Sequence, residues 1–347
     1  MKQQIYLPFF VLLLLTLTGC YKVIDLEYLK TSPRLVLNSI LVAGNPIHAS
    51  ISRTWFHTDE RPTDSISHAD VKLFVNDAFK ENMQWVNSDG ETVLQGYYRA
   101  AYLPVAGDRI KITAAVEGFD AVSAQTIVPQ MIPIDKFTME PLPEATNMSG
   151  TYGYPYRFSV TFTDPGGENN FYFIQFMAYH PVWSEQYGGR YTDEYKWSPL
   201  LINYEDEAVF GNDLSALDKI MDYGNLVSSE GRSFTDDLFD GKTYTLRVKT
   251  NRNYNSYSSY GGNGPWYEGE YPATPPKVYF YAFLYSFSED YYHYMKGIKA
   301  LTDGTIQSEL MDIGMAEPIP VMSNIENGAG ILGACHPDST GLLLEDK

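Results

Sequence analysis

The sequence predicts a mainly β protein, with an N-terminal immunoglobulin-like sandwich followed by a larger antiparallel β domain that contains one or two short helices. Three observations predict this class. Apolar and polar residues alternate over many short segments, as in strands with one buried face. Turn residues separate these segments at short intervals, and helical periodicity is rare. The chain is also rich in residues that favour strands, including 28 tyrosines and 18 phenylalanines.

The first domain is expected over residues 34–130. Alternation and short apolar runs predict strands at residues 35–42, 47–54, 70–75, 97–102, 109–116 and 121–128. Turn residues separate several of these segments, as at 87–90 and at Gly118. Roughly seven short strands within about one hundred residues describe a sandwich of immunoglobulin size.

The second domain is expected over residues 131–337, with 338–347 as a C-terminal tail. Prolines between 129 and 143 predict an extended connection that includes a strand near 134–139. Further strands are predicted at 156–163, 171–179, 244–249 and 277–287. The last of these places five aromatic residues on one face, namely Tyr279, Tyr281, Phe283, Tyr285 and Phe287.

A helix is predicted to begin near Glu289. Ser286 and Glu289 have the spacing of a capping box, and Ser288 is an alternative cap. Apolar residues then recur at helical spacing as far as Leu301, and Gly304 is expected to end the helix. A second, shorter helix is predicted at residues 213–221.

The N-terminus has the pattern of a lipoprotein signal peptide. Lys2 precedes an apolar run over residues 5–17, and small residues then lead into Cys20. We therefore expect residues 1–19 to be removed, Cys20 to be lipidated, and residues 20–33 to form a tether. The alternative is a transmembrane anchor in which Cys20 is incidental, but the apolar run is too short to cross a bilayer comfortably.

The charge of the chain narrows the class of partner, and its cysteine content bears on whether it contains a reactive thiol. The formal net charge is −18, which argues against nucleic acid and against anionic headgroups as partners of the protein surface. With Cys20 lipidated, Cys335 is the other cysteine, and its apolar neighbours predict a buried, inert thiol. A catalytic thiol would need a base, and the adjacent His336 would point to the opposite face of a strand.

A search for catalytic motifs finds no zinc helix, nucleophile elbow, Walker loop or dinucleotide fingerprint in the sequence. We therefore expect no enzymatic activity, cofactor or metal. Acidic clusters at residues 204–207 and 236–240 contain oxygen ligands suited to calcium, but they lack the spacing of a known calcium loop, which favours ordinary acidic turns. A hydrolase would need two carboxylates across a pocket, and no pair stands out.

Aromatic residues in loop-like segments are the candidate ligand contacts. Tyr and Trp give rigid contact area at low entropic cost, and they stack on sugar rings. The candidates are Tyr187, Tyr191, Trp197, Tyr257, Tyr260, Trp266 and Tyr267. The alternative is that these side chains fold back and cover the sheet.

Four stretches carry a resemblance to a known family. They are the Lys-Val-Ile-Asp-Leu run at 22–26, the Leu-Phe-Asp-Gly-Lys-Thr-Tyr run at 238–244, the tyrosine-rich run at 288–296, and the run at 317–331 that contains Ser-Asn-Ile-Glu-Asn-Gly. The mature chain resembles a family of Bacteroidota outer-membrane lipoproteins of unknown function. Residues 323–330 also fit a tight turn before the last core strand.

The resemblance implies a carboxypeptidase regulatory-like N-terminal sandwich and genes beside TonB-dependent, SusC-like receptors, but no catalytic residues. Acidic residues often follow the lipidated cysteine in surface lipoproteins of this lineage, whereas Tyr21 and Lys22 follow it here. We expect a lipid-anchored outer-membrane protein, at the cell surface rather than the periplasmic face. It would act as an accessory protein of a TonB-dependent transporter, and it would itself bind a glycan or a peptide. The alternatives are a carboxylate-based surface hydrolase of glycans or peptides and a structural assembly factor.

Overall fold

The computed structural model describes residues 30–56, 59–60, 65–87, 96–143, 146–148, 151–153, 156–184, 190–211, 227–250, 277–302, 311, 317 and 320–343. These residues form a mainly β structure of sandwich type, as the sequence predicts. Residues 34–54 and those from 65 onward belong to one compact unit, whereas residues 30–33 and 55–60 belong to another. In the smaller unit, Lys30 and Asp59 form an ion pair of 2.6 Å.

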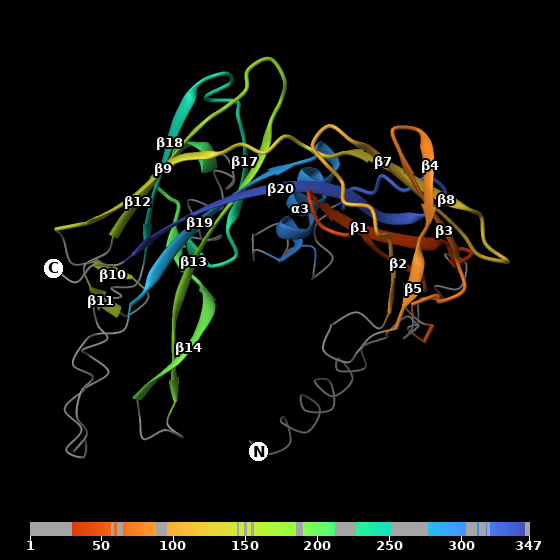
Figure 1. Cartoon of the computed structure of the whole chain (residues 1–347), viewed down its shortest axis with the longest axis horizontal. Coiled ribbons are helices and arrows are strands. Elements are labelled where there is room, and N and C mark those ends of the chain that lie inside the picture. The colour runs from red at the N-terminus through yellow and green to blue at the C-terminus, as the bar shows by residue number, and fades with distance from the viewer. Residues whose placement is uncertain are drawn as a thin grey trace, which may run out of the picture. The chain divides into compact units, whose positions relative to one another are not determined.

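The larger unit is built on a sheet of nine described strands (Figure 1). In spatial order they are β14 (Arg190–Pro199), β13 (Phe171–Ser184), β19 (Tyr279–Phe287), β20 (Ala329–Leu343), β1 (Leu35–Val42), β2 (His48–Arg53), β6 (Tyr97–Arg99) and β5 (Gln84–Val86), with β17 (Arg232–Thr235) pairing with β13. The neighbours are antiparallel except β1 and β20, which run parallel from the Val36–Ala329 pair to the Val42–Cys335 pair.

Two smaller sheets supply the layers that pack on this sheet. The five-stranded sheet has the order β16 (Val227–Ser228), β15 (Ile202–Asn203), β18 (Thr243–Thr250), β12 (Tyr156–Thr163) and β9 (Ile134–Pro141). The four-stranded sheet has the order β4 (Ala78–Asn82), β3 (Asp70–Val75), β7 (Arg109–Ala115) and β8 (Val122–Ile127). A hairpin of β10 (Thr146–Met148) and β11 (Thr151–Gly153) and the 3₁₀ helix η3 (Ala208–Phe210) complete these segments.

The first core lies between the four-stranded sheet and strands β1, β2 and β6. Alternation places Leu37 and Ile51 against Ile112, and all three side chains are fully buried. The C-terminal segment also contributes to this core through Ile325 and Leu332. The first core is therefore not made by residues 34–130 alone, as the sequence had suggested, because the last strand returns to it.

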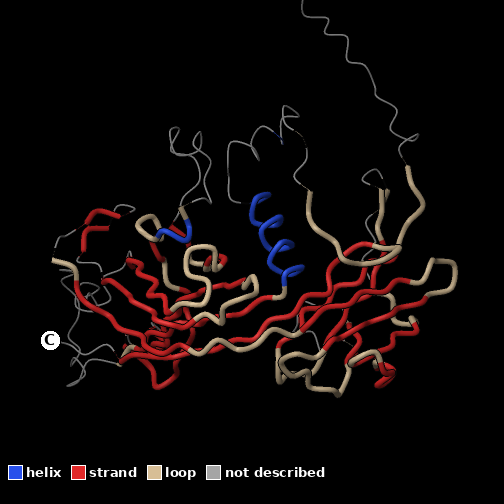
Figure 2. The backbone as a smooth tube through the Cα atoms, turned by 90° about the horizontal axis from the view of Figure 1, so that it is seen from above, coloured by secondary structure: helices blue, strands red, loops and turns tan. Residues whose placement is uncertain are grey.

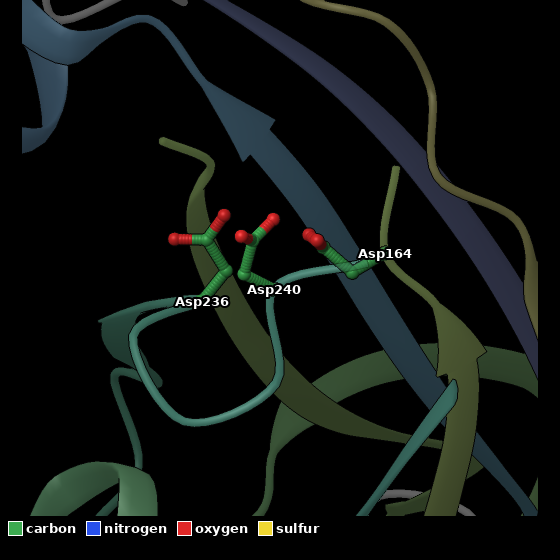
Figure 3. Close-up of side chains that lie close together, drawn as sticks. All are labelled: Asp164, Asp236 and Asp240. Atoms are coloured by element: carbon green, nitrogen blue, oxygen red, sulfur yellow. The ribbon is translucent and has the colours of Figure 1, made fainter. Parts of the chain in front are cut away.

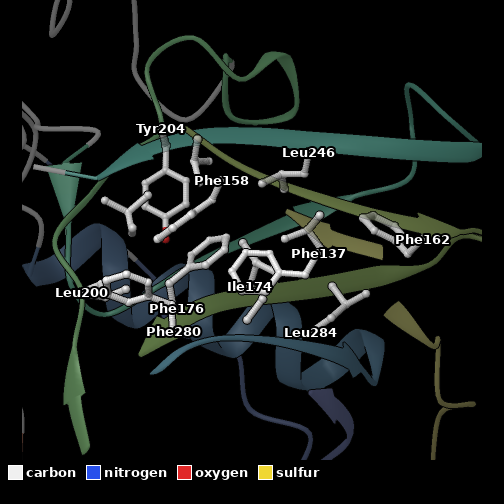
Figure 4. Close-up of a cluster of buried hydrophobic side chains, with 14 of the residues drawn as sticks. Phe137, Phe158, Phe162, Ile174, Phe176, Leu200, Tyr204, Leu246, Phe280 and Leu284 are labelled. Carbon is white, nitrogen blue, oxygen red and sulfur yellow. The ribbon is translucent and has the colours of Figure 1, made fainter. Parts of the chain in front are cut away.

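The second core lies between the five-stranded sheet and strands β13 and β19, and aromatic rings fill it (Figure 4). Phe158 lies 5.5 Å, centroid to centroid, from each of Phe137, Phe176 and Phe280. Aromatic rings bury large apolar areas, so their packing stabilises this core.

Several strand bounds differ from those expected. β13 reaches Ser184 and β14 replaces an expected loop, because the two strands pair from Met177–Pro199 to Ser184–Arg190, with a register shift between Pro181 and Trp183. β20 reaches Leu343, so residues 338–343 are strand rather than tail. On β19 the side chains that enter the core are Phe280, Ala282 and Leu284, not the alternate aromatic ones. The helix expected at 213–221 lies outside the described residues.

The predicted amphipathic helix is confirmed as α3 (Glu289–Thr302). Ser288 precedes it and its carbonyl accepts the first helical N–H, from Tyr292, at 3.0 Å, whereas Ser286 is the penultimate residue of β19. The helix packs on the sheet face opposite the two cores, beside β20 (Figure 2). Gly333 permits this approach, since a Cβ there would lie 2.7 Å from the Cβ of Tyr291. No helix among the described residues has the length and apolar character needed to cross a membrane.

Candidate functional site

Strands β13, β14 and β19 carry a row of aromatic side chains on the face of the sheet that points away from the second core. We call this row the aromatic face. Successive side chains of a strand alternate between faces, so aromatic residues at every second position share one side. Its described members are Phe171, Phe173, Tyr179, Tyr195, Trp197, Tyr279, Tyr281, Phe283, Tyr285 and Phe287.

Trp197 lies among a group of contacting rings at one end of this face. Its ring lies 4.9 Å from that of Tyr179, 4.8 Å from Tyr281 and 5.8 Å from Phe283. Tyr195 continues the row at 5.0 Å from Tyr179. We call Tyr179, Trp197, Tyr281 and Phe283 the Trp197 end. Trp197 is 47% exposed and the other three are half-buried, so these rings present one continuous apolar surface.

Helix α3 covers the other end of the aromatic face. Phe287 lies 4.5 Å from Tyr291 of the helix, and Phe171 lies 4.9 Å from Tyr292. Together with Cys335 these residues form a small third core. The face therefore has a packed end beneath α3 and an end at Trp197 where the largest ring is about half exposed.

The cysteine and tyrosine beneath α3 are uncharged at neutral pH. Burial raises the pKa of the Cys335 thiol to about 11, and burial raises the pKa of Tyr285 as well. Cys335 is buried, as the sequence predicts, and no described residue forms a disulfide with it. Because the thiolate is the nucleophile, this environment makes the thiol inert.

A second feature is a carboxylate cluster formed by Asp164, Asp236 and Asp240, whose ligand oxygens lie within 4.8 Å of one another (Figure 3). The loop from β12 to β13 supplies Asp164, and the loop from β17 to β18 supplies the other two. Among the described residues these are the ones arranged to hold a metal ion. They fall partly within the acidic cluster 236–240 noted in the sequence, but the third carboxylate comes from a different loop.

Protein groups already satisfy much of this cluster. Tyr172 donates its hydroxyl hydrogen to Asp164, and the Gly241 N–H donates to the same carboxylate at 2.8 Å. The Asn170 N–H donates to Asp236 at 2.9 Å. Burial raises the pKa of Asp164, and the negative charges of Asp236 and Asp240 raise it further. Asp164 and Asp236 are each 3% exposed, so this pair does not offer a substrate the accessible carboxylates of a hydrolase.

The other acidic cluster, at residues 204–207, is largely structural. Tyr204 is fully buried, and Glu207 accepts the Tyr244 hydroxyl and the Arg247 N–H. These contacts fix the segment that leads into η3. The Glu207 carboxylate is therefore occupied by contacts within the fold, in agreement with the interpretation of residues 204–207 as a turn.

Of the predicted contact residues, Trp197 lies in the aromatic face, on a strand rather than a loop. Tyr191 lies on β14, where its register partner is Trp183. The others, Tyr187, Tyr257, Tyr260, Trp266 and Tyr267, together with the lipidation residue Cys20, lie outside the described residues. The sequence did not single out Tyr179, Tyr281 or Phe283 as contacts. Their alternation was visible, but both faces of β19 are apolar, so alternation alone could not show which face is buried.

The turn at residues 323–330 serves the core, as one of its two interpretations predicted. The Asn324 side chain bonds with both backbone groups of Leu332 at 2.9 Å and donates to Asp290 of α3 at 2.8 Å. Asn327 and Gly330 have positive φ angles of 59° and 108°. The turn thus joins β20 to the start of α3.

Comparison with known families identifies the family to which the chain belongs. A family model described as a domain of unknown function (DUF4249) matches residues 22–340. The chain belongs to this family. A comparison with curated proteins finds no match. Membership in DUF4249 agrees with the resemblance to a family of unknown function and covers both cores, but it assigns no activity.

Proposed function

We propose that this DUF4249 protein is a non-catalytic binding protein whose ligand contacts the aromatic face. The observation that carries the proposal is the position of Trp197, which is 47% exposed at the end of a continuous row of rings. Large aromatic side chains exposed in a group are the usual anchors of recognition surfaces. The rigid strands β13, β14 and β19 hold these rings in place before any ligand arrives.

The proposal includes the cellular setting expected from the sequence. Lipidation at Cys20 would anchor the protein to the outer membrane of a member of the Bacteroidota, facing the cell surface. There it would act as an accessory of a TonB-dependent, SusC-like transporter. The support for this setting is the signal-peptide pattern and the resemblance at residues 22–26, 238–244, 288–296 and 317–331.

A purification from outer membranes tests the accessory role. The full chain, tagged at its C-terminus, is extracted in mild detergent, and the proteins that accompany it are identified and quantified. We expect a TonB-dependent barrel in about equimolar amount, and we expect Cys20→Ala to abolish membrane association. Recovery of the protein without a barrel would contradict the accessory role.

The Trp197→Ala variant tests the binding face. Because Trp197 is about half exposed, its removal should lower the melting temperature by no more than about 2 °C, while the affinity for the ligand falls by about tenfold or more. Trp55→Ala is the matched control, since Trp55 is 44% exposed and lies in the other unit. Equal ligand binding by the two variants would contradict the assignment of the face.

A further inference from the structure

The geometry points to an uncharged saccharide as the ligand of the Trp197 end, an inference that rests on the proposed binding function. Three observations support it: the uncharged side chains that strand register places on this face, the arrangement of the rings, and the nature of the polar groups beside them.

The described side chains that strand register places on the aromatic face are uncharged, although the chain as a whole is strongly acidic, with a formal net charge of −18. Strand register places further described side chains on this face of β13 and β14 and of the neighbouring β20. They are Gln175, Met177, Pro199, Cys335, Pro337 and Ser339. None of these carries a charge at neutral pH. A charged ligand would lose hydration here without gaining a counter-charge, which costs free energy. An uncharged ligand avoids that cost.

The rings form a platform with a wall. The ring centroids of Tyr281 and Phe283 are 6.2 Å apart, and the two ring planes are inclined by only 30° to each other, so these neighbouring rings have similar orientations. The plane of the Trp197 ring is inclined by 65° to that of Tyr281 and by 67° to that of Phe283, which makes edge-type contacts with both. Gly341 lets Tyr281 lie against β20, because a Cβ there would be 2.6 Å from its ring. A platform of this kind suits the flat C–H face of a pyranose.

Neutral hydrogen-bonding groups flank the platform. Phe283 is directly opposite Gln175 on β13 and Ser339 on β20, and Ser339 is exposed. An amide offers both a donor and an acceptor, and a hydroxyl does the same. A saccharide needs both kinds of group. Aromatic rings contact the apolar face of the sugar, and neutral amide and hydroxyl groups form hydrogen bonds with its hydroxyls.

The edge of the sheet does not favour an added peptide strand. β14 is the last strand in the sheet order, but Pro199 lacks an N–H, Lys196 is exposed, and a register shift interrupts the regular pairing near Trp183. Edge strands that carry proline, lysine and bulges are protected against further pairing. A peptide would therefore lack the main-chain hydrogen bonds that strand addition provides.

The inference is tested by binding to a glycan array of neutral and acidic saccharides, with a peptide library in parallel. The full-length protein in mild detergent is compared with Trp197→Ala, Gly341→Ala and the Trp55→Ala control. Hits are titrated by calorimetry. We expect a neutral saccharide to bind, with affinity lowered roughly tenfold to hundredfold by Trp197→Ala and unchanged by Trp55→Ala. Gly341→Ala should also weaken binding, because the new Cβ displaces Tyr281.

Salt dependence separates the ligand classes. The affinity for an uncharged saccharide should change less than about twofold up to about 1 M NaCl, since no ion pair is screened. Trp197-dependent binding of a peptide or an acidic saccharide alone would overturn the saccharide inference but keep the proposed binding face. If no ligand depends on Trp197, or if this residue supports only self-association of the chain, both are overturned.

Discussion

At the scale of single residues, two glycines with positive φ angles differ in what surrounds them. Gly330 has φ of 108°, and a Cβ there would collide with the Leu37 carbonyl oxygen and lie 2.7 Å from Asn38 Oδ1. Gly330→Ala therefore combines backbone strain with a steric clash at the β1–β20 pairing. We expect it to lower the free energy of unfolding by about 2–4 kcal/mol, measured by urea denaturation.

Gly118 supplies the control for this prediction. Its φ is 85°, but a Cβ there would meet no atom within 4 Å. Gly118→Ala should therefore cost only the conformational strain, about 1 kcal/mol. Equal losses for the two substitutions would show that the close approach of β1 to β20 contributes nothing.

The carboxylate cluster makes stability depend on pH. The folded state raises the pKa of Asp164 above its unfolded value, so ionisation of Asp164 opposes folding at neutral pH, and this cost disappears as the pH falls through the raised pKa. Asp240→Asn removes a neighbouring negative charge and keeps an oxygen to accept the Gly167 N–H. In EDTA at neutral pH we expect the melting temperature to rise by about 1–2 °C.

Acidic solution supplies the control for Asp240→Asn, because the advantage of the variant should vanish once Asp164 is protonated. A lower melting temperature of the variant at neutral pH would contradict this explanation. It would mean that the Asp240 charge itself stabilises the folded state in the absence of a bound cation.

At the scale of elements, Ser288 couples α3 to the sheet. Its hydroxyl accepts the N–H of Ala334 at 3.0 Å, and its carbonyl accepts the N–H of Tyr292. Ser288→Ala would leave the buried Ala334 N–H without this acceptor. We expect a loss of about 1–2 kcal/mol in the free energy of unfolding, with Ser288→Thr retaining most of the stability. Similar losses for both variants would show that the hydroxyl is not what matters.

The elements also show how far local pattern extends. Alternation located most strands of the two cores, but not β15 and β17, which contribute Ile202 and Phe234 to the second core. Capping signals located α3 within a residue or two of its start. Alternation could not predict which face of β19 is buried, because Phe280, Ala282 and Leu284 are as apolar as the aromatic residues between them. Trp197 was a candidate from its type alone. Its ring neighbours Tyr179 and Tyr281 follow from strand pairing, which local sequence does not specify.

At the scale of the whole molecule, β20 connects the two cores. Its first half pairs with β1 and its second half with β19, and the change occurs at Cys335. Leu332 enters the first core, and Leu342 packs against the second. A boundary drawn at 130 from composition misses this connection, because the pairing of β1 with β20 joins residues almost the full chain apart.

A shared strand predicts that the two cores unfold together. Leu332→Ala in the first core and Leu246→Ala in the second each remove a fully buried side chain, and each should cost about 2–4 kcal/mol. Because β20 pairs on both sides, we expect calorimetry to show one transition whose calorimetric and van't Hoff enthalpies agree, and both substitutions should lower its midpoint. Two transitions, each sensitive to only one substitution, would show instead that the cores are independent and that β20 yields locally between them.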